Sequence, residues 1–278
     1  MSLRWKFRDR VLDLSGRALI LGIVNVTPDS FSDGGRFVEV DAAVAFGLEM
    51  VAQGADLLDL GGESTRPGSV PVSLDEERQR VLPVLEGLRR RTDVPISVDT
   101  SKAALADAVL TAGAQIINDV TAGGDPAMPA VVAKHGAGVI LMHMQGTPAT
   151  MQDDPSYRDA PAEIVEHLQL RMTGFLNAGV ATDCIALDPG IGFGKTFEHN
   201  LEILVRLREL RRLGRPICLG VSRKGFLGQI TGRARSDRGV ASAAVAAYCL
   251  AHGSVDIVRV HDVPPHRDVV RVMAALRP

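Results

Sequence analysis

The chain has 278 residues with 31 basic and 33 acidic side chains, so its formal net charge at pH 7 is −2. A balanced charge gives no general attraction to nucleic acid or to an anionic membrane, and we expect neither as a partner. No apolar run approaches the roughly 20 residues of a membrane-spanning helix, and residues 1–17 lack the apolar core of a signal peptide. The three cysteines, Cys184, Cys218 and Cys249, are far apart in apolar segments, which is typical of reduced thiols in a cytoplasmic protein.

The chain length is close to the roughly 250 residues of one (β/α)8 barrel, and we expect a single domain over residues 1–278. Near the start, residues 5–14 alternate apolar and charged side chains, a pattern typical of β-strands. We predict that residues 1–17 contain a short β-hairpin that closes the N-terminal end of the barrel.

Eight short apolar runs follow, and each ends at or just before a residue with a possible functional role. In chain order the runs span residues 19–24, 57–60, 96–98, 116–117, 139–142, 185–187, 217–221 and 257–258, and the residues after them are Asn25, Gly61, Asp99, Asn118, His143, Asp188, Ser222 and Arg259. Helical periodicity covers residues 42–52, 74–91, 102–111, 128–134, 162–177, 201–213, 240–251 and 267–276. Continuous apolar strands are typical of a parallel sheet buried on both faces. We therefore predict the α/β class, as one (β/α)8 TIM barrel with its active site at the C-terminal ends of the strands.

Two connections are longer than the roughly 2–6 residues of ordinary βα loops. These loops, 1 and 2 of the barrel, span residues 26–40 and 63–73, follow neighbouring strands, and are rich in Gly, Pro, Ser and Asp. Long loops at this rim are usually functional, so we predict two lids over the active site. A third long connection spans residues 145–159. The alternative, tolerated surface insertions, requires two of them to fall side by side on the active rim by coincidence.

Two glycine-rich segments fail the motifs that they resemble. Residues 189–196 begin with Pro189 where a Walker loop requires glycine, and Lys195 stands where a dinucleotide fingerprint requires one. Residues 220–224 end with Lys224 where a nucleophile elbow requires glycine. The histidines and cysteines lack the spacing of a zinc site. The sequence therefore indicates neither a nucleotide loop, nor a nucleophilic serine, nor zinc.

Side chains at the strand ends suit a flat heterocycle with several N–H donors. Asp99, Asn118 and Asp188 present oxygens that accept hydrogen bonds from a guanidine-like edge. Taken singly, a buried acid or amide at a strand end also fits a structural role, and Lys224 also fits a solvated charge. Their common place at one rim favours a binding site.

A second group of residues suits a phosphorylated substrate. Arg259 and His261 are two residues apart in one strand, so their side chains face the same way. A cationic pair of this kind binds phosphate, and a salt bridge to Asp262 is the structural alternative. Asn25 is a candidate ligand for a Mg²⁺ ion that keeps most of its waters and binds substrate phosphates.

Eight segments, in this order, resemble the motifs of the dihydropteroate synthase family. They are residues 25–35 (NVTPDSFSDGG), 61–68 (GGESTRPG), 97–100 (SVDT), 117–119 (IND), 141–146 (LMHMQG), 188–195 (DPGIGFGK), 222–224 (SRK) and 259–262 (RVHD). The resemblance extends from Leu19 to Val263, and the ordered set is far more specific than any single motif.

The resemblance implies a transferase of folate biosynthesis, a cytoplasmic homodimer and a target of sulfonamides. Its reaction condenses 6-hydroxymethyl-7,8-dihydropterin diphosphate with 4-aminobenzoate, and gives 7,8-dihydropteroate and diphosphate with the help of Mg²⁺. Residues 240–251, which are rich in alanine, are a candidate dimer face, although this helix could equally pack on its own barrel.

The resemblance also implies a role for each matching residue. The pterin would contact Asp99, Asn118, Met142, Asp188, Lys224 and Arg259. The diphosphate would contact Asn25, Arg259 and His261, with Asn25 as the metal ligand. The aminobenzoate would contact Phe31, Thr65, Arg66, Pro67, Phe193, Ser222 and Lys224. The residues expected to act in catalysis are Asp99, Asp188, Lys224, Arg259 and His261.

The implied chemistry fits these residue types. A pterin stabilises a cation at its exocyclic methylene once diphosphate leaves, and an arylamine is already nucleophilic. The protein then acts electrostatically, with Arg259, His261 and Mg²⁺ on the leaving group and Asp99 or Asp188 near the cation. We expect an SN1-like order in which the loops close and exclude water before the amine attacks.

One residue departs from the family pattern. Gly225 follows the 222–224 motif, where family members often carry a serine or a longer polar side chain near the aminobenzoate carboxylate. Only its backbone N–H remains there for an anion such as the aminobenzoate carboxylate. The alternatives are a non-catalytic pterin-binding paralogue and a pterin-dependent methyltransferase; Arg259 and His261 argue against the latter, because it has no diphosphate to bind.

Overall fold

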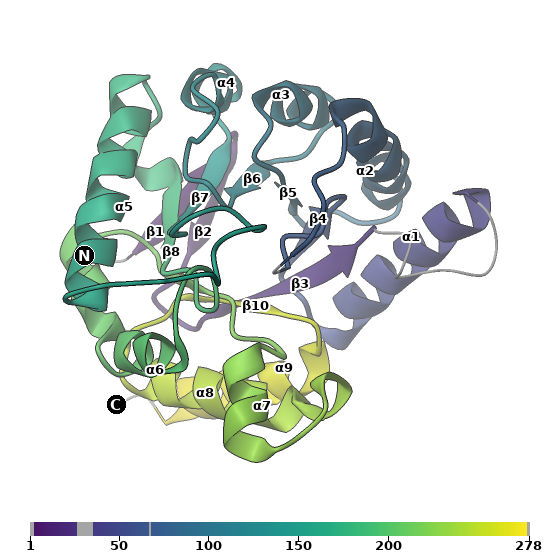
Figure 1. Ribbon diagram of the computed structural model, residues 1–278. Helices are drawn as coiled ribbons and strands as arrows, with labels where there is room; N and C mark the ends of the chain where they lie inside the picture. Colours follow the sequence, from purple (N-terminus) through teal and green to yellow (C-terminus); the bar gives the residue numbers. More distant parts are fainter. Residues whose placement is uncertain (1–2, 27–35, 67, 277–278) are drawn as a thin grey trace.

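The computed structural model describes residues 3–26, 36–66 and 68–276, and within these its centre is a sheet of eight parallel strands. The strands are β3 (Leu19–Asn25), β4 (Leu57–Gly61), β5 (Ile96–Asp99), β6 (Ile116–Asp119), β7 (Gly138–Met142), β8 (Ile185–Asp188), β9 (Cys218–Leu219) and β10 (Ile257–Val260). They pair in chain order from β3 to β8, and β10 pairs with both β9 and β3. A bridge from Leu187 to Ile217 joins β8 to the start of β9, so the sheet closes (Figure 1). The predicted (β/α)8 barrel is confirmed.

Helices surround the barrel and cover the apolar side chains that its strands direct outwards (Figure 1). They are α1 (Arg36–Gln53), α2 (Leu74–Arg89), α3 (Ala103–Thr111), α4 (Met128–His135), α5 (Ala160–Asn177), α6 (Phe197–Val205), α7 (Gly225–Thr231), α8 (Gly239–Ala251) and α9 (Val263–Ala275). Several begin at a polar cap, which satisfies an otherwise free N–H of the first turn. At the start of α2, the side chain of Ser73 accepts a hydrogen bond from the backbone N–H of Glu76. At the start of α5, the side chain of Asp159 accepts one from the backbone N–H of Ala162.

Four helices differ clearly from the prediction. Helix α1 begins at Arg36, within the expected loop over residues 26–40, rather than at residue 42. The expected helix over residues 201–213 is two elements, because α6 ends at Val205 and a 3-10 helix follows over Leu207–Leu213. Leu207 and Leu210 are both buried, and this spacing of three fits the three-residue turn of a 3-10 helix. Helix α9 begins at Val263 because prolines in the first turn are tolerated. The short helix α7, which contains two glycines, was not predicted.

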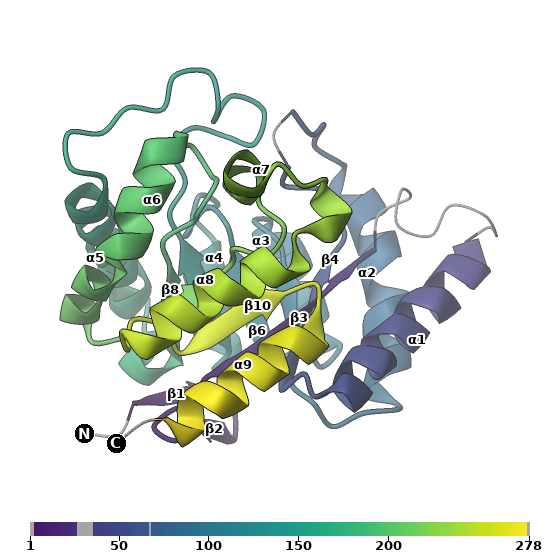
Figure 2. The same ribbon diagram turned by 90° about the horizontal axis from the view of Figure 1, so that it is seen from below.

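The N-terminal hairpin packs into the interior of the barrel. It consists of β1 (Arg4–Phe7) and β2 (Arg10–Asp13), which pair antiparallel. Trp5 and Phe7 are fully buried, and Trp5 Nε1 donates to the carbonyl of Cys184 at 3.0 Å. They join interior residues of the strands in one apolar cluster: Leu19, Leu21, Leu57, Ile116, Ile140, Ala186, Cys218 and Ile257. Figure 2 shows the hairpin at the end of the barrel opposite to α7, where we predicted it.

The interior changes from apolar to polar along the strands. Every second residue of a strand faces the same side. The residues that stand two positions after members of the apolar cluster therefore also face the interior, and they are Asp59, Asn118, Asp188 and Arg259. Strand β5 contributes Asp99. The three cysteines are buried and form no disulfide. Among the described residues, no helix is both long and apolar enough to cross a membrane.

Gly190 follows β8 at a point where no side chain fits. Its φ is +67°, and an added Cβ would lie 1.9 Å from the carbonyl oxygen of His143. We expect Gly190→Ala to lower the free energy of unfolding by more than the ~1–2 kcal/mol of left-handed backbone strain alone. The measurement is urea denaturation followed by circular dichroism.

The matched control is Gly174→Ala, in the exposed part of α5, where an added Cβ meets nothing within 4 Å. Helix propensity favours alanine there by ~0.5–1 kcal/mol, so this variant should be slightly more stable than the parent. Equal urea midpoints for Gly190→Ala and the parent would contradict the packing argument.

Candidate active site

A cavity of about 720 Å³ opens at the C-terminal ends of the strands, and a deeper part of about 20 Å³ continues into the barrel. Every described residue of the predicted site lines one or both of these spaces: Asn25, Thr65, Arg66, Asp99, Asn118, Met142, Asp188, Phe193, Ser222, Lys224, Arg259 and His261. Phe31 and Pro67 lie outside the described residues. The structure therefore brings together residues that the sequence spreads over more than 230 positions, from Asn25 to His261.

The deep part is lined by hydrogen-bond acceptors. Asp99, Asn118 and Asp188 are all buried, and Met142 forms an apolar wall beside them. Burial raises the pKa of Asp188, against the lowering effects of the Gly190 N–H and Lys224. Burial also raises the pKa of Asp99, against the lowering effect of Arg259. Burying carboxyl oxygens is costly without donors, so this surface favours a ligand that supplies several N–H groups.

Arg259 lies between two carboxylates in the barrel interior. Its Nε donates to Asp59 Oδ2 at 2.6 Å, and its Nη2 donates to Asp99 Oδ2 at 2.8 Å. Burial alone would lower the pKa of Arg259, but the two carboxylates raise it above its usual value. The alternative pairing with Asp262 is wrong, because Asp262 binds Arg223 instead, with Nε to Oδ2 at 2.9 Å.

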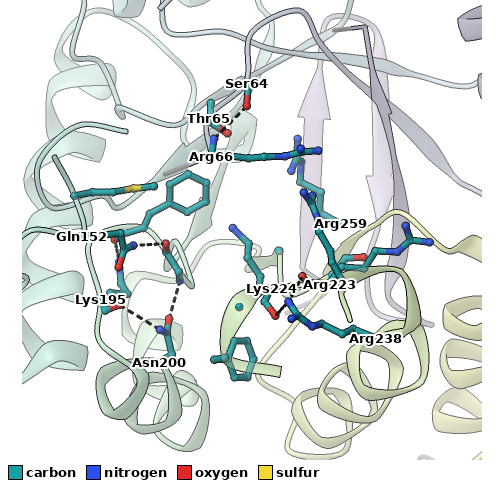
Figure 3. A pocket seen from close by; sticks show the side chains of 18 of the residues that line it. Ser64, Thr65, Arg66, Gln152, Lys195, Asn200, Arg223, Lys224, Arg238 and Arg259 are labelled. Atoms are coloured by element: carbon teal, nitrogen blue, oxygen red, sulfur yellow. Dashed lines mark hydrogen bonds between the residues drawn. The ribbon is translucent and has the colours of Figure 1, made fainter. Parts of the chain in front are cut away.

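Lys224 stands where the deep part meets the open cavity. Its Nζ lies 3.9 Å from the centre of the Phe193 ring, a cation–π contact. Burial lowers the pKa of Lys224 to about 7, and Arg259 acts in the same direction, whereas Asp188 and Asp99 oppose them. In Figure 3, the cavity around Lys224 has Gln152, Lys195 and Asn200 on one side and Arg223, Arg238 and Arg259 on the other.

The backbone that carries Lys224 is held in a strained turn. Arg223 has a φ of +58°, which is unfavourable for a residue other than glycine. Its N–H donates to Ser242 Oγ at 2.9 Å, and Arg238 donates to the carbonyl of Lys224 at 3.2 Å. These contacts fix the direction of Lys224 at the start of α7, where Gly225 also lines the cavity.

The open part of the cavity is cationic. Arg223, Arg235 and Arg238 line it together with Arg259 and His261, and His261 Nδ1 lies 2.9 Å from Ser222 Oγ. Burial lowers the pKa of His261 to about 3, and Arg259 and the other arginines add to this. A neutral imidazole among guanidinium groups suits an anionic group by hydrogen bonding and by charge.

Asn25 is the one predicted metal ligand, and its side chain faces this cavity. Its Oδ1 would lie 3.7 Å from a side chain added at Gly61, so the glycine leaves room beside it. Among the described residues there is no group of three or more His, Cys, Asp or Glu side chains that could hold a metal. A single amide oxygen suits Mg²⁺ that keeps its waters and is bound mainly by substrate phosphates. The residues present therefore fit such an ion.

Three features of the site were not predicted. Asp59 lies inside an apolar run, and only its position two residues before Gly61 signals that it faces the interior. Arg235 and Arg238 lie on a segment without a strand signal. Lys195 was given no role, although it is 2% exposed, donates to Phe193 O at 2.9 Å and has its Nζ 3.0 Å from His143 Nδ1.

Two partly buried ion pairs of Lys102 anchor the second long loop. Lys102 Nζ binds Glu63 Oε2 and Glu77 Oε2, both at 2.5 Å, and Glu77 is fully buried. Glu63 is also the acceptor for the N–H of Val72, at the other end of the loop. Thr65 and Arg66 therefore project from a loop that is fixed at both ends.

Comparison with known proteins agrees with this geometry. The family model of pterin binding enzymes matches residues 21–261, which extend from the first barrel strand to His261. The dihydropteroate synthase of Escherichia coli (strain K12) is 43% identical over 264 residues, which are 95% of this chain and 93% of that protein. The chain belongs to the dihydropteroate synthase family.

Solved structures of other dihydropteroate synthases share the whole fold. The Xanthomonas albilineans enzyme with 4-aminobenzoic acid has 43% identity and a TM-score of 0.93, and all of both chains is covered. The Yersinia pestis enzyme in complex with a sulfonamide drug has 42% identity and a TM-score of 0.92, with 98% of each chain covered. The likeness therefore extends over nearly the whole chain.

Lys195 gives a pH-dependent prediction. Burial lowers the pKa of Lys195 to about 7, and Lys224 adds to this while Asp188 opposes it, whereas an unfolded lysine titrates near ~10.4. Between these values the unfolded chain binds a proton that the folded chain lacks, so folding becomes more favourable as pH rises. We expect the stability of the parent relative to Lys195→Met to rise between pH 7 and pH 9.5, by up to ~1.4 kcal/mol per pH unit.

Chemical denaturation at several pH values measures this difference. Lys134→Met, at an exposed lysine of α4, reports the effect of removing a surface charge. A stability difference between the parent and Lys195→Met that stays constant over this range would show that Lys195 keeps its proton in the folded chain.

Proposed function

We propose that this chain condenses 6-hydroxymethyl-7,8-dihydropterin diphosphate with 4-aminobenzoate to form 7,8-dihydropteroate and diphosphate. The observation that carries the proposal is the division of one cavity into a deep, acceptor-lined part and a cationic mouth, with Lys224 lining both. This division matches a substrate with a donor-rich ring at one end and a diphosphate at the other. Membership of the dihydropteroate synthase family supports the same reaction.

The pterin ring would lie at the inner end of the 720 Å³ cavity, against the acceptors that line the small deep part. Its N–H groups would donate to Asp99, Asn118 and Asp188, and Met142 would contact the face of the ring. Lys224 would donate to an acceptor atom of the ring. The buried acceptors are then satisfied by the ligand, which favours pterin over a ring with fewer donors.

The diphosphate would occupy the cationic mouth, where Arg259 and His261 would bind its oxygens. Asn25 would hold Mg²⁺ there, and the ion would supply charge that favours departure of the diphosphate. The exposed arginine Arg235 adds positive charge beside these residues. The chain's own residues thus bind and orient the leaving group in a site built for anions.

The 4-aminobenzoate would bind near Thr65, Arg66, Phe193 and Ser222, with the amine directed towards Lys224. Lys195 donates to the carbonyl of Phe193 and so holds the backbone from which this ring projects. Phe31 and Pro67 belong to the same expected group. Gly225 can contribute only backbone to this part of the site.

The proposed order is SN1-like. The bond between the methylene carbon and the diphosphate oxygen breaks first, and both electrons leave with the diphosphate. The amine nitrogen then forms the new bond to carbon and loses one proton to solvent or to the released diphosphate. Asp99 and Asp188 stabilise the positive charge on the pterin between these steps. If diphosphate release in a single turnover depended strictly on the aminobenzoate concentration, this order would be wrong.

A coupled assay tests the function directly. With dihydropterin diphosphate, 4-aminobenzoate and Mg²⁺, we expect diphosphate and dihydropteroate in equal amounts, measured by chromatography. Lys224→Ala should lower kcat/KM by roughly 100-fold, the usual effect of losing one well-placed polar group in an active site, and chelation of the metal should stop the reaction. Lys134→Ala removes an exposed lysine of α4 and should leave the rate unchanged.

The products distinguish the alternatives. Diphosphate without dihydropteroate would indicate an intact pterin part and a failed amine part, and would direct attention to Gly225. Pterin binding without either product would refute the synthase and favour a non-catalytic paralogue. Full activity of Lys224→Ala would remove this lysine from the mechanism.

We also propose a homodimer that forms through α8, in a cytoplasmic protein with reduced thiols. Support comes from the exposed residues of this helix, which are apolar at helical spacing: Val240, Ala244, Tyr248 and Ala251. Val240 is 81% exposed, which is unusual for a valine. Burial against the same face of a second copy would remove these side chains from water.

Light scattering tests the dimer. We expect twice the chain mass of 29.6 kDa for the parent and the single mass for Val240→Asp, because a charge would be buried at the contact. Val205→Asp, at an exposed valine of α6, is the matched control and should stay dimeric. A single mass for the parent would refute the proposal.

A further inference from the structure

We propose that Asp59 is a positioning residue that sets the orientation of both the Asn118 amide and the Arg259 guanidinium. It thereby decides which ring edge the deep part accepts and which nitrogen Arg259 offers to the leaving group. This inference rests on the proposed function, which it extends to a residue that touches neither substrate.

Asp59 lies in the middle of β4 and faces the barrel interior. Its side chain is fully buried, and it lines neither part of the cavity. Asn118 Nδ2 donates to its Oδ2 at 3.0 Å, and Arg259 Nε donates to the same oxygen at 2.6 Å. One buried carboxylate oxygen therefore joins the predicted pterin residue of β6 to the cationic residue of β10.

The contact with Asn118 fixes which end of that amide faces the ligand. An amide carries donors on nitrogen and acceptor lone pairs on oxygen. Because a carboxylate only accepts, the NH₂ group must point to Asp59, and the Asn118 oxygen is left for the deep part. At this position the site therefore accepts a hydrogen bond from the ring, and binding of a ring that has an acceptor there is disfavoured.

The contact with Arg259 fixes the direction of the guanidinium. Nε binds Asp59 and Nη2 binds Asp99, while Nη1 makes no hydrogen bond to any described residue. Arg259 also lines the open cavity, so this nitrogen is available to an anion. Asp99 is itself a proposed pterin ligand and must share its oxygens with the ring. Asp59 has no such second task, so it holds Arg259 in place when the ring is bound.

Two substitutions separate the two effects. In Asp59→Asn, an amide oxygen at the Oδ2 position still accepts from Asn118 and Arg259, and the NH₂ group takes the place of Oδ1, which has no partner among the described residues. The hydrogen bonds remain and the charge is lost. Asp59→Ala removes both. Ser97→Ala is the matched control, because Ser97 is the register partner of Asp59 on β5, fully buried, and its Oγ has no partner among the described residues.

The readouts are binding of 6-hydroxymethylpterin, which carries no diphosphate, and the KM values of both substrates. For Asp59→Asn we expect pterin affinity within about threefold of the parent, and kcat/KM for the dihydropterin diphosphate reduced roughly tenfold or more, because Arg259 has lost a charged partner. For Asp59→Ala we expect pterin affinity itself to fall roughly tenfold or more. The KM for 4-aminobenzoate should stay within about threefold in both variants, and Ser97→Ala should match the parent.

Two results would overturn the proposal. One is a folded Asp59→Ala variant with the affinity and KM values of the parent. The other is an equal rise in the KM values of both substrates that also occurs in Ser97→Ala. This result would mean that any substitution here lowers the stability of the barrel in general. If Asp59→Ala does not fold, Asp59→Asn tests the proposal alone. It supports the proposal when pterin affinity is kept and kcat/KM falls, and contradicts it when kcat/KM is unchanged. A parent that forms no dihydropteroate would refute the proposed function, whereas pterin binding by the variants would still test Asp59.

Discussion

The fold confines several charges in the interior of a closed barrel, and the pairing of Arg259 with Asp59 and Asp99 is the interaction on which the rest of the site depends. Removing one partner from a buried ion pair leaves an uncompensated charge, which destabilises a protein strongly. The strands β4, β5 and β10 must therefore keep these three side chains in register. An apolar layer beneath them, closed by Trp5 and Phe7, keeps water from the other end. The deep part of the cavity is thus built from the barrel strands themselves.

The proposed aminobenzoate part is built differently, because its residues come from loops and from the start of α7. Each of these segments is held by contacts of its own. Arg238 and Ser242 hold the strained turn at Arg223, Lys195 holds the carbonyl of Phe193, and Lys102 holds the loop with Thr65. The burial of Lys195 reduces stability, since it lowers the pKa of this lysine to about 7. This cost is understandable where the lysine orients a binding surface.

The sequence was sufficient for the barrel and for the twelve predicted residues that line the cavity. Apolar runs that end in polar residues predict both the strands and the residues of the active-site rim, because the C-terminal ends of parallel strands lie at the same end of the barrel. The network behind that rim could not be predicted in the same way. Asp59 sits between leucines, and no local pattern tells which distant donors share its oxygen. Arg238 acts through backbone carbonyls of another segment, which only the folded chain brings near. The split of residues 201–213 likewise depends on which leucines the barrel buries.

The distribution of charge along the barrel axis would favour ionisation of the proposed substrate in this cavity. Carboxylates lie at the deep end, where positive charge would form on the pterin, and arginines lie at the mouth, where diphosphate would carry its negative charge. Such groups are oriented before the reaction, so they need no rearrangement as the bond breaks. Lys224 lies between the two regions. Because burial lowers its pKa to about 7, this lysine repels a nearby cation less strongly. The same gradient would draw the departing diphosphate outwards and leave the cation for the amine.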